Sequence, residues 1–228
     1  MANRINIDFR TNLSAERTYI TQLLSISQEI RRIVRNDKDP VSALRRYARQ
    51  IEDWAFTTSN NMIDRVNKHN LKQWAQLRNS WGIRLNVVEQ IPNYYNLIME
   101  NVLYIQSLPL ECAENISDLI VNAINTGQRT DDLAKLIQHE ADITIGRAKL
   151  IARTETSRSQ TIMTEQRAKI AGSDGYIWRT SEDQKVRQSH KMMDNRYVNW
   201  ATPPTLDGLV GHAGALPNCR CYPEPVFN

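Results

Sequence analysis

Two stretches in the last third of the chain decide how the whole sequence is interpreted: LIARTETSRSQ at residues 150–160 and PNCRCYPEPV at residues 217–226. Between them lie Trp178, the run SEDQKVRQSH at residues 181–190 and a loop rich in glycine and proline. None of these features is diagnostic alone. Their order and spacing together are the most specific signal in the sequence.

This last third is predicted to combine one long helix with short strands. Gly172 is expected to end the helix, because glycine readily adopts the left-handed backbone that follows many helix C-termini. Aromatic and β-branched residues around Trp178 predict a strand. The expected elements are a helix over residues 144–171, strands over 176–180 and 197–198, a short helix over 186–193, a loop over 202–214 and a last strand over 218–222, ended by Pro223 and Pro225.

The sequence before residue 144 predicts amphipathic helices. Apolar residues recur at three- and four-residue spacing from Leu13 to Val34, which places them on one helix face. Asp39 and Pro40 suit the start of a second helix, as its capping residue and its first helical residue. Further helices are expected over residues 94–105, 112–124 and 133–139, with Pro92 and Pro109 at the starts of the first two and Gly127 as a C-cap.

The composition changes near residues 141–146, from nearly continuous helix to a sequence punctuated by glycine, proline and aromatic residues. We therefore predict a mainly α fold. An N-terminal multi-helix region over residues 1–143 precedes a small α+β C-terminal module over residues 144–228. Long apolar helix faces in the first region are expected to serve partner docking.

The bulk properties exclude several classes of protein. The 228 residues are 41% hydrophobic and 24% charged, as in soluble globular domains. No apolar run reaches the roughly 18–20 residues of a membrane span, so no membrane-spanning helix is expected. The three cysteines are an odd number, so they do not predict a framework of paired disulfides. The net charge of +4 and the pI near 9.0 are compatible with acidic neighbours such as packaged nucleic acid.

Four residues form a candidate metal site. Cys219 and Cys221 are two residues apart, so in an extended strand both thiols lie on one face and can share a metal ion. His190 and His212 are the candidate third and fourth ligands of a structural zinc ion. In the alternative interpretation, the cysteines are small half-buried hydrophobic residues and His190 is hydrogen-bonded to Asp183 or Asp194.

A second hypothesis is enzymatic: Glu155, Asp183 and His190 would act in a hydrolase or nuclease-like module, with or without a metal ion at Cys219 and Cys221. It requires these side chains to converge in one cleft. The alternative for Glu155 is an ion pair with Arg158, three residues along the helix, while the adjacent Ser and Thr residues pack against another element. A zinc ion closed by four protein ligands would leave no position for a reacting water.

A third hypothesis is non-specific DNA binding. The sequence has neither a recognition-helix motif nor a dense basic cluster with interleaved aromatic residues, so sequence-specific binding is not expected. Phosphate attraction without sequence preference is compatible with the basic pI.

The motifs of the last third occur in a fixed order: ARTET at residues 152–156, Trp178, Asp-x-x-Val-Arg-x-x-His at residues 183–190, and Cys-Arg-Cys at residues 219–221 after a proline-rich loop. This ordered set resembles the phage Mu F-like head-morphogenesis proteins, also called minor head or minor capsid proteins. The resemblance covers about residues 130–226. It implies that these residues form the structural motif: Arg153, Glu155, Trp178, Asp183, Arg187, His190 and Arg220.

The resemblance also implies a role. Members of this family are non-enzymatic virion components, made in the host cytoplasm and placed in the capsid interior. They associate with the portal vertex and assist head assembly and DNA packaging or ejection. The implied partners are the portal protein or the major capsid protein, with non-specific contact to packaged DNA.

The chain departs from the family pattern at two places. Many relatives have Cys-x-x-Cys where Arg187 and His190 stand, and a histidine where Leu216–Pro217 precede the Cys-Arg-Cys segment. Hydrogen bonds are the alternative to a complete four-ligand zinc set in this chain. They would run from Arg187 or Arg220 to Asp183, and from His190 to a backbone carbonyl.

Overall fold

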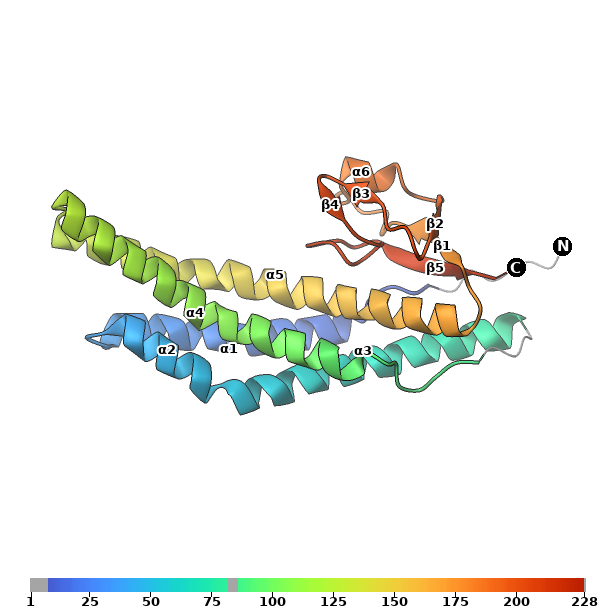
Figure 1. The fold of residues 1–228 in the computed structure, drawn as a ribbon, viewed down its shortest axis with the longest axis horizontal. Helices are drawn as coiled ribbons and strands as arrows, with labels where there is room; N and C mark the ends of the chain where they lie inside the picture. The colour runs from blue at the N-terminus through green and yellow to red at the C-terminus, as the bar shows by residue number, and fades with distance from the viewer. Residues whose placement is uncertain (1–7, 82–85, 228) are drawn as a thin grey trace. The chain divides into compact units, whose positions relative to one another are not determined.

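The computed structural model describes residues 8–81 and 86–227. In these ranges the chain forms helices and a small antiparallel sheet near the C-terminus, which confirms the predicted mainly α fold with a small α+β part (Figure 1). The helices are α1 (Leu13–Asn36), α2 (Pro40–Gln50), α3 (Glu52–Trp81), α4 (Tyr94–Thr126), α5 (Thr130–Ile170) and α6 (Gln188–Lys191), and the strands are β1 (Gly175–Arg179), β2 (Tyr197–Asn199), β3 (Thr205–Leu206), β4 (Leu209–Val210) and β5 (Tyr222–Val226).

The chain divides into two compact units. One comprises the described residues of Met1–Glu16, Met62–Leu97 and Arg153–Asn228, and the other comprises Arg17–Asn61 and Ile98–Ala152. Helices α1, α3, α4 and α5 each contribute residues to both units. The predicted boundary between residues 143 and 144 falls inside α5 and stays a prediction. None of the described helices is both long and apolar enough to cross a membrane.

Local sequence signals set several helix ends. Asp39 caps α2, because its side chain accepts the backbone N–H of Ser42 at 3.1 Å, and Pro40 is the first helical residue. Gly127 follows α4 with a φ of +65°, and Gly172 follows α5 with a φ of +89°. These helix ends confirm the sequence predictions.

Two predicted helix breaks are wrong. Helix α4 continues through Pro109, and α5 runs without a break from Thr130 to Ile170, through residues 140–143 between the predicted helices 133–139 and 144–171. A proline inside a helix costs about 3 kcal/mol. The apolar stripe nevertheless stays in helical phase across Pro109, so packing outweighs the local cost. The buried residues on both sides of it are Val102, Ile105, Leu108, Cys112 and Ile116.

The unit of residues 17–61 and 98–152 is helical. A buried hydrogen bond, from the hydroxyl of Tyr19 to the side-chain oxygen of Asn101 at 3.0 Å, joins α1 to α4. The core is aliphatic, whereas the outer faces of α4 and α5 expose several large apolar side chains. These are Leu103, Leu110, Val121, Ile124, Leu136, Ile143 and Leu150.

In the other unit, β1 is the central strand of a sheet ordered β2-β1-β5, which lies beside the C-terminal part of α5 (Figure 1). The predicted strands around Trp178 and at Tyr197 are confirmed. The last strand differs, because β5 contains Pro223 and Pro225 where the sequence predicts an end. It is an edge strand that pairs with β1 alone, and the two prolines alternate with residues whose N–H groups face β1.

Two short elements also differ from the prediction. Helix α6 covers four residues instead of 186–193, because the chain before it forms a turn in which the Asp183 side chain accepts the N–H of Lys185 at 2.8 Å. The predicted loop over residues 202–214 contains the β3–β4 hairpin. Its two turn residues, Asp207 and Gly208, have φ values of +52° and +78°. An Asp-Gly pair is typical of such a turn, so this hairpin had a local signal that sequence analysis missed.

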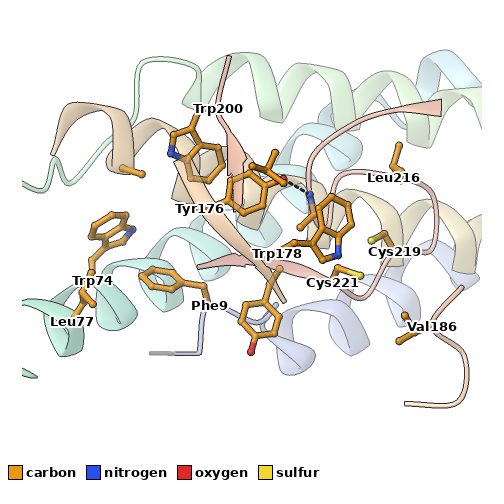
Figure 2. Close-up of a cluster of buried hydrophobic side chains, with 14 residues drawn as sticks. Phe9, Trp74, Leu77, Tyr176, Trp178, Val186, Trp200, Leu216, Cys219 and Cys221 are labelled. Atoms are coloured by element: carbon orange, nitrogen blue, oxygen red, sulfur yellow. Dashed lines mark hydrogen bonds between the residues drawn. The ribbon is translucent and has the colours of Figure 1, made fainter. Parts of the chain in front are cut away.

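An aromatic core positions the sheet and its loops (Figure 2). The ring centroids of Tyr176 and Trp200 are 4.4 Å apart, and those of Phe9 and Trp74 are 5.3 Å apart. The hydroxyl of Tyr176 accepts the backbone N–H of Ala213 at 3.2 Å. Strand β1 is thereby linked to the loop that leads to the cysteines.

A buried arginine anchors the segment between α3 and α4. The guanidinium of Arg167 donates to the carbonyls of Val88 and Glu89, at 2.9 and 2.8 Å, and to the side-chain oxygen of Asn70 at 2.5 Å. Burial lowers the pKa of Arg167 to about 10. This charge is stabilised by neutral acceptors and holds Val88 and Glu89 beside α5.

Candidate functional site

A row of hydroxyl side chains on α5 fixes the segment that carries the cysteines. Thr154 Oγ1 accepts the backbone N–H of Asn218 at 3.1 Å, and Thr161 Oγ1 donates to the carbonyl of Ala213 at 2.7 Å. Ser157 adds a third bond to the same segment, 3.3 Å long. These three residues lie near one another on one helix face. The small polar residues within and after the ARTET motif therefore position the loop, and sequence analysis did not identify them individually.

Gly214 allows the loop to approach α5 closely. Its φ is +86°, and a Cβ atom there would lie 2.5 Å from Thr161 Oγ1 and 2.8 Å from the carbonyl oxygen of Cys221. Its backbone N–H donates to the sulfur of Cys219 at 3.4 Å. Only glycine fits both this conformation and this space.

The loop brings both cysteine thiols to His190. The Nδ1 atom of His190 lies 3.4 Å from Cys219 Sγ and 3.5 Å from Cys221 Sγ. The three candidate ligand atoms lie within 4.8 Å of one another, and all three residues are buried. The group could hold a metal ion. Both cysteines precede β5, so the loop and not the predicted strand brings the thiols together.

The electrostatics of the group favour a thiolate at Cys219. Hydrogen bonding to Cys221 and to His190 lowers the pKa of Cys219 to about 4, against the opposing effect of burial. The pKa of Cys221 is raised by its hydrogen bond to Cys219 and by burial. Metal ligation requires deprotonated thiols, so metal binding would release the proton that Cys221 retains.

Trp178 and α6 hold His190 in place. The rings of Trp178 and His190 are perpendicular, with centroids 5.6 Å apart, and both residues are buried. Figure 2 shows the two cysteine sulfurs at the edge of the aromatic core, beside Trp178. The Nε2 atom of His190 is buried and has no hydrogen-bond partner among the described residues. His190 is bonded to sulfur instead of to the aspartate or the backbone carbonyl considered from the sequence.

The structure does not bring His212 into this group. Its Nδ1 atom lies 3.2 Å from the hydroxyl of Tyr176, and its ring packs 5.6 Å from that of Trp200. Burial lowers the pKa of His212. Of the four candidate ligands predicted from the sequence, the structure therefore places three together and His212 apart.

The charged motif residues on α5 form ion pairs. Arg153 lies 3.8 Å from Glu16, and Arg158 donates to Glu155 at 3.1 Å. The second pair is the one expected from the three-residue spacing. Glu155 is buried, whereas Arg158 is partly exposed.

Arg220 and Arg187 hold the corner beside the cysteines in different ways. Arg220 donates to Asp183 at 2.7 Å, one of the two pairs considered from the sequence, and this bond holds the pKa of Asp183 below its usual value. Arg187 donates to the carbonyl of Pro217 at 2.6 Å instead. Both arginines therefore tie the Cys-Arg-Cys segment to the chain before α6.

The residues of the enzymatic hypothesis are separated in two cavities that the described residues form. A cavity of about 10 Å³ beside His190 is lined by neither Glu155 nor Asp183. An open pocket of about 350 Å³ beside Asp183 is lined by neither Glu155 nor His190. The convergence in one cleft that this hypothesis requires is not observed in these two cavities.

Comparison with known proteins identifies the class to which this module belongs. Residues 114–223 match the family described as Phage Mu protein F like protein. This match confirms the resemblance seen in the ordered motifs. No solved structure matches the chain with significance.

Individual relatives cover part of the chain. It is 28% identical over 180 residues to an uncharacterized protein of Haemophilus influenzae (76% of this chain, 40% of the relative). It is 24% identical over 144 residues to minor head protein GP7 of Bacillus phage SPP1 (54% and 46%). It is 27% identical over 122 residues to NAD(+)–arginine ADP-ribosyltransferase EFV of Enterococcus faecalis (49% and 25%). The chain spans less than half the length of each of these relatives.

Proposed function

We propose that this chain is a non-enzymatic minor head component of a phage or prophage. It lies inside the capsid at the portal vertex and assists head assembly and DNA packaging or ejection. The observation that carries this proposal is the Mu F-like family match over residues 114–223. The similarity to a phage minor head protein supports it.

The partners we propose are the portal protein or the major capsid protein. Exposed apolar side chains on α4 and α5, within the proposed docking region of residues 1–143, support a protein contact. Leu103 is 64% exposed and Ile124 is 75% exposed. Large apolar side chains gathered on one part of a surface are typical of interaction sites. The net charge of +4 supports non-specific attraction to packaged DNA.

The similarity to an ADP-ribosyltransferase supports an enzymatic function less well than the family match supports a phage head protein. The activity is in the name of that relative, and the match covers only 25% of the relative's length. The separate surroundings of Glu155, Asp183 and His190 also favour a structural role for these residues. We therefore retain the non-enzymatic proposal.

We further propose that His190, Cys219 and Cys221 bind a structural zinc ion. With Zn–S bonds of about 2.3 Å, Zn–N bonds of about 2.05 Å and tetrahedral angles, the sulfur and nitrogen ligands of one zinc ion are about 3.6 Å apart. The observed separations of 3.4 and 3.5 Å fit this value. The ion would join α6 to the segment before β5, and it would add to the stability of the module because the unfolded chain lacks a preformed site.

Particle association tests the proposed role. Particles from the phage or prophage that encodes this chain are purified by sedimentation, treated with nuclease and washed at high salt. We expect the chain to remain with the particles, because it is held by protein contacts inside the head. Recovery of the chain only among soluble proteins would contradict the proposal.

A further inference from the structure

The described part of the chain supplies three ligands to the candidate metal site and no fourth. No other His, Cys, Asp or Glu side chain within the described ranges joins His190, Cys219 and Cys221 in their group. His212 faces Tyr176 instead. Zinc in proteins is usually four-coordinate. A zinc ion held by these three residues would therefore have one coordination position left.

A small cavity adjoins the three ligands. Its volume of about 10 Å³ corresponds to roughly one water-sized sphere. Besides the ligands, its lining includes Lys185, Arg187, Asn218 and Arg220. Lys185, Asn218 and Arg220 are exposed, so the cavity lies between the buried ligands and the protein surface. One small ligand fits this space.

The charges around the cavity favour an anion. Its lining carries the positive charges of Lys185, Arg187 and Arg220. Asp183 offsets one of them through its 2.7 Å ion pair with Arg220. A divalent zinc ion bound by two thiolates adds no net charge. The balance around the fourth position is therefore positive, which stabilises a small anion relative to a neutral ligand.

We propose that the zinc ion of this chain has three protein ligands, His190, Cys219 and Cys221, and that its fourth position takes an exchangeable small anion or water through the cation-lined cavity. The inference rests on the zinc binding proposed above. A zinc site closed by four side chains is structural, whereas an open position lets the ion bind a donor from another molecule. The site would thus be a binding site as well as a cross-link.

Substitution of zinc by cobalt tests this inference, because the visible absorption of Co²⁺ reports its coordination. The full-length chain is freed of metal under reducing, oxygen-free conditions and loaded with Co²⁺. We expect one Co²⁺ per chain and the intense bands of a tetrahedral thiolate site. Addition of sodium azide is expected to shift these bands with a saturable dependence on concentration.

Three variants make the test specific. Lys185→Gln removes a charge at the cavity and is expected to weaken azide binding several-fold while Co²⁺ still binds. Lys68→Gln, a matched change at an exposed lysine paired with Asp64, is expected to leave azide binding unchanged. His212→Gln is expected to leave the Co²⁺ spectrum unchanged.

The outcomes separate the two proposals. If Co²⁺ binds but azide leaves its spectrum unaltered, the fourth position is closed and this inference is wrong, although the zinc proposal stands. A His212→Gln variant that newly acquires azide sensitivity would show that His212 is the fourth ligand. If neither Co²⁺ nor Zn²⁺ binds, the zinc proposal and this inference both fall. Particle association is measured independently of all these results.

Discussion

The backbone N–H of Asn218 donates to Thr154 Oγ1 at 3.1 Å, across 64 residues of sequence. This bond joins the ARTET motif of α5 to the residue just before the Cys-Arg-Cys segment. The two motifs are therefore two sides of one contact. The helix face and the loop that packs on it are built from these two motifs.

The hydroxyl row on α5 should contribute measurably to stability. In Thr161→Val the side-chain shape is retained, but the buried carbonyl of Ala213 loses its hydrogen bond. We expect the free energy of unfolding, measured in urea, to fall by about 1–3 kcal/mol. Thr126→Val, at an exposed hydroxyl bonded within α4, is the control and should change stability by less than about 0.5 kcal/mol. Equal effects in the two variants would contradict the proposed role of the row.

Gly214 and Gly208 form a matched pair of glycines. Both have positive φ values, +86° and +78°, but a Cβ atom at Gly208 would meet nothing within 4 Å. We expect Gly208→Ala to cost about 1–2 kcal/mol, from backbone strain alone. Gly214→Ala should cost about 3 kcal/mol or more, because the loop must also move away from α5. Thermal unfolding of the two variants checks this. A Gly214→Ala protein as stable as Gly208→Ala would show that the close approach is unimportant.

The half-buried position of His212 predicts a pH dependence of stability. Burial lowers the pKa of His212 in the folded chain, so below its unfolded value of about 6.5 the unfolded state binds more protons. The free energy of unfolding should therefore fall as the pH decreases through and below about 6.5. Urea unfolding at several pH values should show a smaller decrease for His212→Gln, since the other titrating groups are common to both proteins. The same decrease in both would contradict this assignment.

The exposed apolar face of α4 should be required for docking. Leu103 and Val210 are each 64% exposed, but only Leu103 lies in the proposed docking region. We expect Leu103→Asp to reduce the amount of chain in purified particles several-fold while the protein stays folded, as judged by circular dichroism. Val210→Asp, in the β3–β4 hairpin, should be incorporated normally. Equal incorporation of the two variants would exclude Leu103 from the docking contact.

Elements set by local chemistry could be predicted from the sequence. Capping of α2 by Asp39 and the end of α5 at Gly172 follow from preferences that act within a few residues. The breaks predicted at Pro109 and at residues 140–143 are wrong, and at Pro109 tertiary packing is the reason. Pro109 is buried within a continuous apolar stripe, and the burial of that stripe outweighs the lost helical hydrogen bond.

The candidate site could be predicted only in part, because some of its features are local in sequence and others depend on tertiary packing. Cys219 and Cys221 are only two residues apart in the sequence, and His190 is one of two histidines in the predicted C-terminal module. The aromatic core decides which histidine faces the thiols, because His212 lies against the hydroxyl of Tyr176 instead. The contribution of Thr161 depends on its contact with a segment 52 residues away. No local pattern carries such information.

Quantitative mass spectrometry of purified, nuclease-treated particles tests the central claim most directly. Peptides of this chain, of the portal protein and of the major capsid protein would be measured together against labelled standards. The account predicts a few copies of this chain per particle, in a constant ratio to the portal protein and far below the major capsid protein. Absence of the chain from particles that contain both other proteins would contradict the account.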